Sequence, residues 1–157
     1  MQYLLRVRYA ECDAQGVVFN ARYGDYVDIA ATEFYRALFG GYDQLLARGL
    51  DTQVVNYQIS WQAPARFDQV LRIEVATLKV GNSSFTLQLS FRDHDSNTGI
   101  ADAQITYVMV TAGDHGKTPI PDDVRLRLEK GAPDCVTDHA GYVSAGTQNS
   151  SVVPMPQ

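Results

Sequence analysis

The sequence lacks the features that mark several large classes of protein. Only two of its 157 residues are cysteine, Cys12 and Cys135, too few for a disulfide scaffold. No stretch approaches the roughly 20 consecutive apolar residues that span a membrane, and the N-terminal stretch has no secretion signal. Lysine and arginine are outnumbered 13 to 18 by aspartate and glutamate and form no cluster, which argues against nucleic-acid binding. We therefore expect a cytoplasmic protein that neither inserts into membranes nor binds nucleic acid.

The length and composition are those of one ordinary globular domain. Hydrophobic residues make up 45% of the chain and charged residues 20%, close to the average for folded proteins. From Gly131 onward the chain has no lysine or arginine and is rich in glycine, proline, serine and threonine. We expect a folded domain over residues 1–130 and a flexible C-terminal tail over 131–157.

A single long helix is predicted near the N-terminus. Residues 3–9 alternate between apolar and polar side chains, as a half-buried strand does. Residues 21–39 then carry apolar side chains at spacings of three and four, which is typical of an amphipathic helix. Asn20 is suited to cap its start, and the glycine pair 40–41 is a stop signal. A short second helix is predicted over residues 42–48.

Most of the following sixty residues are predicted to be strands. Alternating apolar side chains and turn-forming links indicate strands over residues 53–63, 67–79, 84–93 and 100–112. A further short helix is expected over residues 122–130. One long helix followed by a continuous run of strands predicts an α+β domain, with the helix laid against one face of an antiparallel sheet.

The segment from Tyr9 to Tyr23 carries a motif with a family resemblance. This motif lies between the first predicted strand and the long helix. The motif positions are Asp13, Gly16, Val18 and Tyr23. The segment resembles the signature of the 4-hydroxybenzoyl-CoA thioesterase family and of the Tol-Pal-associated acyl-CoA thioesterases, within the hotdog superfamily. The similarity continues through residues 63–68 and 81–84 and covers roughly residues 3–128.

The resemblance implies a fold, an assembly and a substrate. The fold is the α+β hotdog fold, a curved antiparallel sheet of five or more strands wrapped around one long central helix. The assembly is a homodimer or homotetramer, with the site where two subunits meet. The substrate is an acyl-CoA or an acyl carrier protein thioester, and no cofactor or metal is implied.

The resemblance also assigns roles to three residues near the helix start. Asp13 attacks the thioester carbonyl as a nucleophile or activates a water as a general base, and the backbone N–H of Asn20 polarises that carbonyl. Gly16 lets the loop pass close to the substrate. The structural alternative for Asp13 is a turn aspartate that bonds its own backbone. Glu11 is expected to face solvent at the strand end, or to raise a neighbouring pKa as a second carboxylate.

Six further residues are candidates for substrate binding, and five of them have a structural alternative. Tyr23, Tyr57 and Trp61 are expected to line the acyl pocket, although Tyr57 and Trp61 also suit a core. Arg66 is placed to contact CoA phosphate or to form a surface salt bridge. Ser83 and Ser84 lie near the thioester of a dimer or simply occupy a hairpin turn.

The sequence departs from the Tol-Pal-associated pattern at one position, where those members often carry histidine and this chain has Asn20. Its three histidines, His94, His115 and His139, are expected at the surface. Neither a serine-nucleophile elbow nor metal-ligand spacing is present. A thioesterase that depends on Asp13 is the first hypothesis. The second is a non-catalytic acyl-CoA or acyl-carrier-protein binding protein, and a dehydratase or hydratase ranks last.

Overall fold

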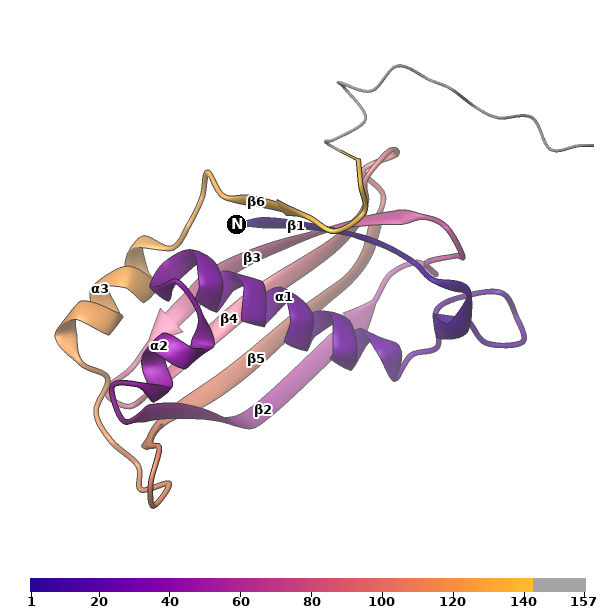
Figure 1. Cartoon of the computed structure of the whole chain (residues 1–157). Helices are drawn as coiled ribbons and strands as arrows, with labels where there is room; N and C mark the ends of the chain where they lie inside the picture. The colour runs from indigo at the N-terminus through magenta and orange to yellow at the C-terminus, as the bar shows by residue number, and fades with distance from the viewer. Residues whose placement is uncertain (143–157) are drawn as a thin grey trace, which may run out of the picture.

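The computed structural model describes residues 1–142, which form one curved sheet and three α-helices (Figure 1). The strands are β1 (Gln2–Arg6), β2 (Leu50–Trp61), β3 (Val70–Val80), β4 (Ser84–Asp93), β5 (Gly99–Thr111) and β6 (Val136–Asp138). The helices are α1 (Arg22–Phe39), α2 (Tyr42–Leu46) and α3 (Asp122–Lys130), with a 3-10 turn over Tyr9–Glu11. The predicted long helix and the four predicted central strands are confirmed, with shifted ends. No helix within residues 1–142 is long and apolar enough to cross a membrane.

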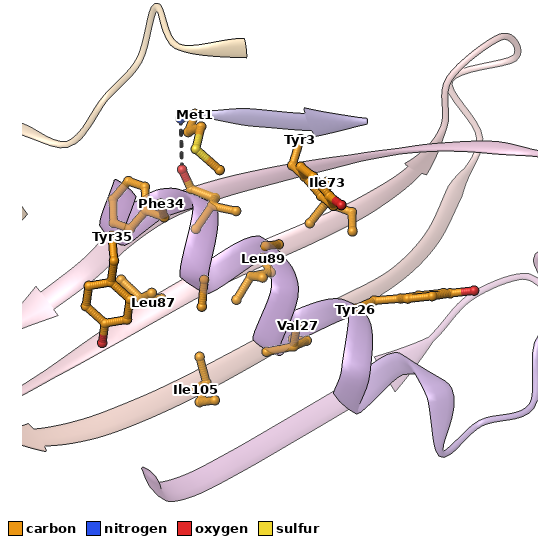
Figure 2. Packing of buried hydrophobic residues seen from close by; sticks show 14 of the residues in the cluster. Met1, Tyr3, Tyr26, Val27, Phe34, Tyr35, Ile73, Leu87, Leu89 and Ile105 are labelled. Atoms are coloured by element: carbon orange, nitrogen blue, oxygen red, sulfur yellow. Dashed lines mark hydrogen bonds between the residues drawn. The ribbon is translucent and has the colours of Figure 1, made fainter. Parts of the chain in front are cut away.

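The core lies between α1 and the concave face of the sheet (Figures 1 and 2). Val27 and Phe34 of α1 point into the layer formed by Leu87 and Leu89 of β4, and all four are at most 1% exposed. Side chains along β4 alternate between buried and half-buried, as period-two patterning predicts. Gly40 ends α1 in the left-handed conformation with φ of 87°, so the predicted glycine stop is confirmed.

The two edges of the sheet differ. The strand order is β2-β5-β4-β3-β1-β6, and every pairing is antiparallel except that of β6 with β1. β2 forms one edge, and β5 is its sole partner among the described strands. β6 covers the other edge by pairing with residues 2–4.

Two predicted boundaries near the termini were wrong. The sheet continues past residue 130, where we expected the folded domain to end, because backbone hydrogen bonds to β1 hold a strand too short to show periodicity. The rest of the predicted tail, residues 143–157, lies outside the described residues. The predicted strand 3–9 ends at Arg6, and Tyr9 is 82% exposed in the 3-10 turn that follows.

Candidate active site

A cavity of about 450 Å³ lies where the loop before α1 meets the end of β2. Four of the predicted site residues line it together: Asp13, Asn20, Tyr23 and Trp61. Sequence reasoning assigned no site role to the rest of the wall, which consists of Val17, Val18, Phe19, Gln62, Ala63 and Pro64, although Val18, Ala63 and Pro64 belong to the stretches that carry the resemblance. The side chains of these residues give no chemical signal in the sequence. They lie at the wall because the loop pairs with the chain after β2. The volume of the cavity is that of a small-molecule binding site.

The loop that carries Asp13 is a narrow hairpin. Cys12 and Val18 pair as an antiparallel bridge, and the Asp13 N–H donates to the Val17 carbonyl at 2.8 Å. Gly16 closes the turn by donating its N–H to the Asp13 carbonyl at 2.9 Å. The Gly16 φ is +73°, and a Cβ added there would meet no atom within 4 Å. In this chain Gly16 therefore serves the backbone conformation of the turn, while the predicted close approach of a substrate to it stays a prediction.

The Asp13 carboxylate is half-buried and has one oxygen held in place. Its Oδ1 accepts the N–H of Gln15 at 2.8 Å, which is the turn arrangement that we considered as the structural alternative. Within residues 1–142, Oδ2 has no hydrogen-bond partner. The same side chain lines the cavity. The turn bond therefore orients the carboxylate and leaves one oxygen for chemistry.

Asn20 contributes an unpaired backbone donor at the same cavity. The prediction that its side chain caps α1 was wrong, because the cap position falls at Ala21 and no side chain bonds there. The N–H groups of Arg22 and Tyr23 instead reach the carbonyls of Phe19 and Asn20, three residues back, in a tight first turn. Among the described residues the Asn20 N–H has no acceptor. This donor lies at the positive end of the α1 dipole, where it can stabilise a developing oxyanion.

Two aromatic rings form the wall of the cavity. Tyr23 is 2% exposed, and its ring meets those of Trp61 and Phe91 edge to face, with centroids 5.9 and 5.7 Å apart. Trp61 is 48% exposed at the mouth. Burial raises the pKa of Tyr23, although the nearby Ala65 backbone opposes this, so the phenol stays neutral. The wall therefore offers an apolar surface beside the Asp13 carboxylate.

The other predicted binding residues do not line this cavity within one chain. Tyr57 lies on β2 opposite Ile105 and is 39% exposed. Arg66 is exposed, and its backbone pairs with Val17 while its N–H donates to Gln69. Ser83 lies in the link between β3 and β4 and Ser84 begins β4, at the far end of the sheet. Their roles in substrate binding stay predictions.

Glu11 is placed differently from our expectation. It was predicted to face solvent at a strand end, but it is 6% exposed. Its carboxylate accepts hydrogen bonds from the backbone and side chain of Arg8 and from the Tyr26 hydroxyl. Arg8 three residues earlier and a tyrosine on the apolar face of α1 were signals in the sequence that pointed to this burial.

No histidine lines the cavity in the part of the chain that is described. His139 shares a 2.9 Å hydrogen bond with the Tyr3 hydroxyl, and the His94 ring stands 4.5 Å from that of Tyr142. Residues 1–142 also contain no group of three or more metal-ligating side chains. The chemical groups that the site does contain are a carboxylate, a backbone N–H and a helix N-terminus.

Comparison with known proteins agrees with the fold and identifies the family. The Thioesterase-like superfamily matches residues 7–128. The acyl-CoA thioester hydrolase YbgC of Escherichia coli O6:H1 is 30% identical over 108 residues, which cover 68% of this chain and 78% of that protein.

Two crystal structures share the fold. One is a hypothetical protein of Aquifex aeolicus with a TM-score of 0.75 and 26% identity, covering 82% of this chain and 98% of that chain. The other is a gentisyl-coenzyme A thioesterase with a TM-score of 0.71, 25% identity and the same two coverages. The α+β arrangement is therefore the hotdog fold that the sequence predicted. The chain belongs to the Thioesterase-like superfamily.

Proposed function

We propose that this protein hydrolyses the thioester of an acyl-CoA or aroyl-CoA to the free acid and CoA. The observation that carries the proposal is that one cavity is lined by Asp13 and by Asn20, whose backbone N–H has no acceptor within residues 1–142. When a thioester lies between them, its carbonyl carbon faces a carboxylate oxygen of Asp13. Its carbonyl oxygen faces the N–H donor of Asn20. The relatives that are named as an acyl-CoA thioester hydrolase and a gentisyl-CoA thioesterase support this substrate class.

Two routes from this geometry balance in atoms and charge. In the first, Oδ2 of Asp13 bonds to the thioester carbon and the C–S bond breaks. The thiolate leaves and takes up a proton, and water then cleaves the mixed anhydride. In the second, Asp13 takes a proton from a water that attacks the same carbon directly, the C–S bond breaks, and the leaving thiolate takes up that proton. In both routes negative charge develops on the carbonyl oxygen, which the Asn20 N–H and the α1 dipole stabilise.

The assembly that we propose is a homodimer, or a tetramer built from it, joined through the free edge of β2. Four large hydrophobic side chains of β2 are exposed by 39 to 59%: Val54, Val55, Tyr57 and Trp61. An edge strand with unpaired backbone groups and apolar side chains pairs readily with another strand. Such pairing places Tyr57 of one subunit beside the β2 of the other, which would bring it to the acyl pocket.

A second candidate function is binding of an acyl-CoA or acyl carrier protein without hydrolysis. The hydrogen bond from Gln15 to Asp13 favours it, because a turn aspartate needs no catalytic role. The absence of histidine from the cavity wall points the same way. Tight binding of a CoA thioester without turnover would establish this alternative.

The proposal is tested by thiol release from a panel of CoA thioesters, with the wild type and Asp13→Asn. Asparagine keeps the oxygen that accepts the Gln15 N–H but loses the charge, so we expect the fold to stay intact and kcat to fall at least about 1,000-fold. Asp114→Asn is the matched control, because Asp114 also accepts the N–H two residues ahead, from Gly116, and lies in another turn. Equal turnover in both variants would contradict the role of Asp13.

Labelled water separates the two chemical routes. A single turnover in H₂¹⁸O, followed by mass analysis of the peptide that contains Asp13, leaves label in the side chain only after nucleophilic attack. Label found solely in the released acid indicates the general-base route.

A further inference from the structure

We propose that Glu11 and Tyr26 are positioning residues that hold the loop of Asp13 and the Asn20 N–H in register for the reaction. The inference rests on the function proposed above. Glu11 and Tyr26 do not line the cavity around Asp13. They act on it through the backbone hairpin that both proposed reactive groups share.

The Glu11 carboxylate lies at the centre of a closed set of hydrogen bonds. Its Oε2 accepts the Arg8 N–H at 2.7 Å and the Tyr26 hydroxyl at 2.7 Å, and its Oε1 accepts the Arg8 Nε at 2.7 Å. A carboxylate that is 6% exposed needs such partners, because an unpaired buried charge is costly. The Tyr26 hydroxyl is 2.7 Å from it and belongs to α1, so this bond joins the loop to the helix.

The charges of this pair are set by their surroundings. Burial raises the pKa of Glu11, but the hydrogen bonds from Arg8 and Tyr26 outweigh it and hold the pKa below its ordinary value. Burial and the adjacent carboxylate raise the pKa of Tyr26 well above that of a free tyrosine. The carboxylate therefore stays charged and the phenol stays a donor across neutral pH.

We call Glu11 with its partners Arg8 and Tyr26 the anchor. The backbone of Glu11 connects this anchor to the two proposed reactive groups, the Asp13 carboxylate and the Asn20 N–H. Its carbonyl accepts the Phe19 N–H at 2.9 Å, which is the first link of the hairpin. The bridge between Cys12 and Val18 follows, and then the bond from Asp13 to Val17. Asp13 thus lies two residues beyond the anchor on one arm, and Asn20 directly follows Phe19 on the other.

A loss of the anchor therefore disturbs the spacing of the carboxylate and the N–H donor together. Displacement of reacting groups by about 1 Å can cost about 100-fold in rate. A residue that stabilises the fold alone would not change kcat of the folded enzyme.

Tyr3 provides a matched control for Tyr26. The two tyrosines are 3% and 2% exposed and line the same cavity of about 270 Å³ between β1 and α1. Both hydroxyls are hydrogen bonded, but the partner of Tyr3 is His139 in the C-terminal segment. Tyr3→Phe and Tyr26→Phe thus remove the same group from the same environment, and Tyr26→Phe alone touches the hairpin.

The test measures kcat, KM and Tm for both variants with the CoA thioester that the wild type hydrolyses best. We expect Tyr26→Phe to lower kcat about 10-fold with KM within about 2-fold, and Tyr3→Phe to keep kcat while Tm falls to a similar extent in both. Glu11→Gln, which keeps an acceptor for Tyr26, is expected to retain more kcat than Glu11→Ala. Equal kcat in the two tyrosine variants would overturn the inference.

Amide hydrogen exchange tests the same inference without relying on turnover. The N–H groups of Asp13, Val18 and Phe19 are expected to exchange at least about 10-fold faster in Tyr26→Phe than in Tyr3→Phe. Unchanged exchange would overturn the positioning role. A wild type that hydrolyses no thioester would refute the proposed function instead, and exchange would still decide whether the pair orders the hairpin.

Discussion

Gly16 and Gly24 are two glycines beside the candidate site at which the same substitution has opposite effects. A Cβ at either position meets no atom within 4 Å, so neither change causes a clash. Gly16 has φ of +73°, and alanine there is expected to destabilise the fold by about 1 kcal/mol. Gly24 is in α1, where alanine is expected to stabilise by about 0.5 kcal/mol. Urea unfolding of both variants checks the signs, and a destabilising Gly24→Ala would contradict this account.

Asp93 makes stability depend on acid pH. The Ser96 N–H donates to it at 2.7 Å and, with further bonds from the Ser96 hydroxyl and the Asp95 N–H, outweighs burial and holds the pKa of Asp93 below its ordinary 3.8. A pKa that is lower in the folded chain stabilises the fold above about pH 4, and this contribution is lost as pH falls through the folded-state value.

Asp93→Asn is accordingly expected to cost about 2 kcal/mol at pH 7. The difference from the wild type should shrink below about pH 4, where the wild-type carboxyl takes up a proton. Urea unfolding at pH 7, 5 and 3 measures this difference in stability. A difference that stays constant down to pH 3 would show that the charge of Asp93 is not the cause.

At the scale of elements, the packing of α1 decides stability. Phe34 is fully buried against the sheet, and Phe34→Ala is expected to cost about 4 kcal/mol because it removes a buried ring and leaves a cavity. Leu126 on α3 is 66% exposed, so Leu126→Ala is expected to change stability by less than about 0.5 kcal/mol. Chemical denaturation compares them, and similar costs would contradict the position of the core.

The elements also show which parts of this fold the sequence predicts and why it does not predict the others. The helix over Arg22–Phe39 and the strand over Ser84–Asp93 were predictable, because their apolar spacing repeats over several turns or pairs. The 3-10 turn at Tyr9–Glu11 and the strand β6 were missed, since three residues show no period. The position of Asp13 and Asn20 at one cavity was predictable from a local motif, while their roles stay predictions. The Glu11 anchor was missed because its partner Tyr26 comes from another element.

At the scale of the whole molecule, the free edge of β2 predicts self-association. Val55 is 59% exposed at an irregularity of β2, and Leu78 is 55% exposed at a similar irregularity of β3. Val55→Glu would place like charges together across the proposed β2 to β2 contact, so we expect it to shift the proposed dimer to monomer and to lower activity. Leu78→Glu, on an inner strand, is expected to leave the dimer intact. Sedimentation equilibrium measures both, and a dimeric Val55→Glu would contradict this contact.

The short strand β6 also has a consequence for growth of such assemblies. A subunit whose sheet had two open edges could pair with another subunit at each edge, and such pairing could continue into a long polymer. Here the border next to β1 is occupied by residues 136–138 of the same chain, which present only three residues outward. Among residues 1–142, β2 is therefore the one long edge that is open to strand addition, and a pair formed through β2, as proposed, would have only the three-residue strand β6 at each outer edge.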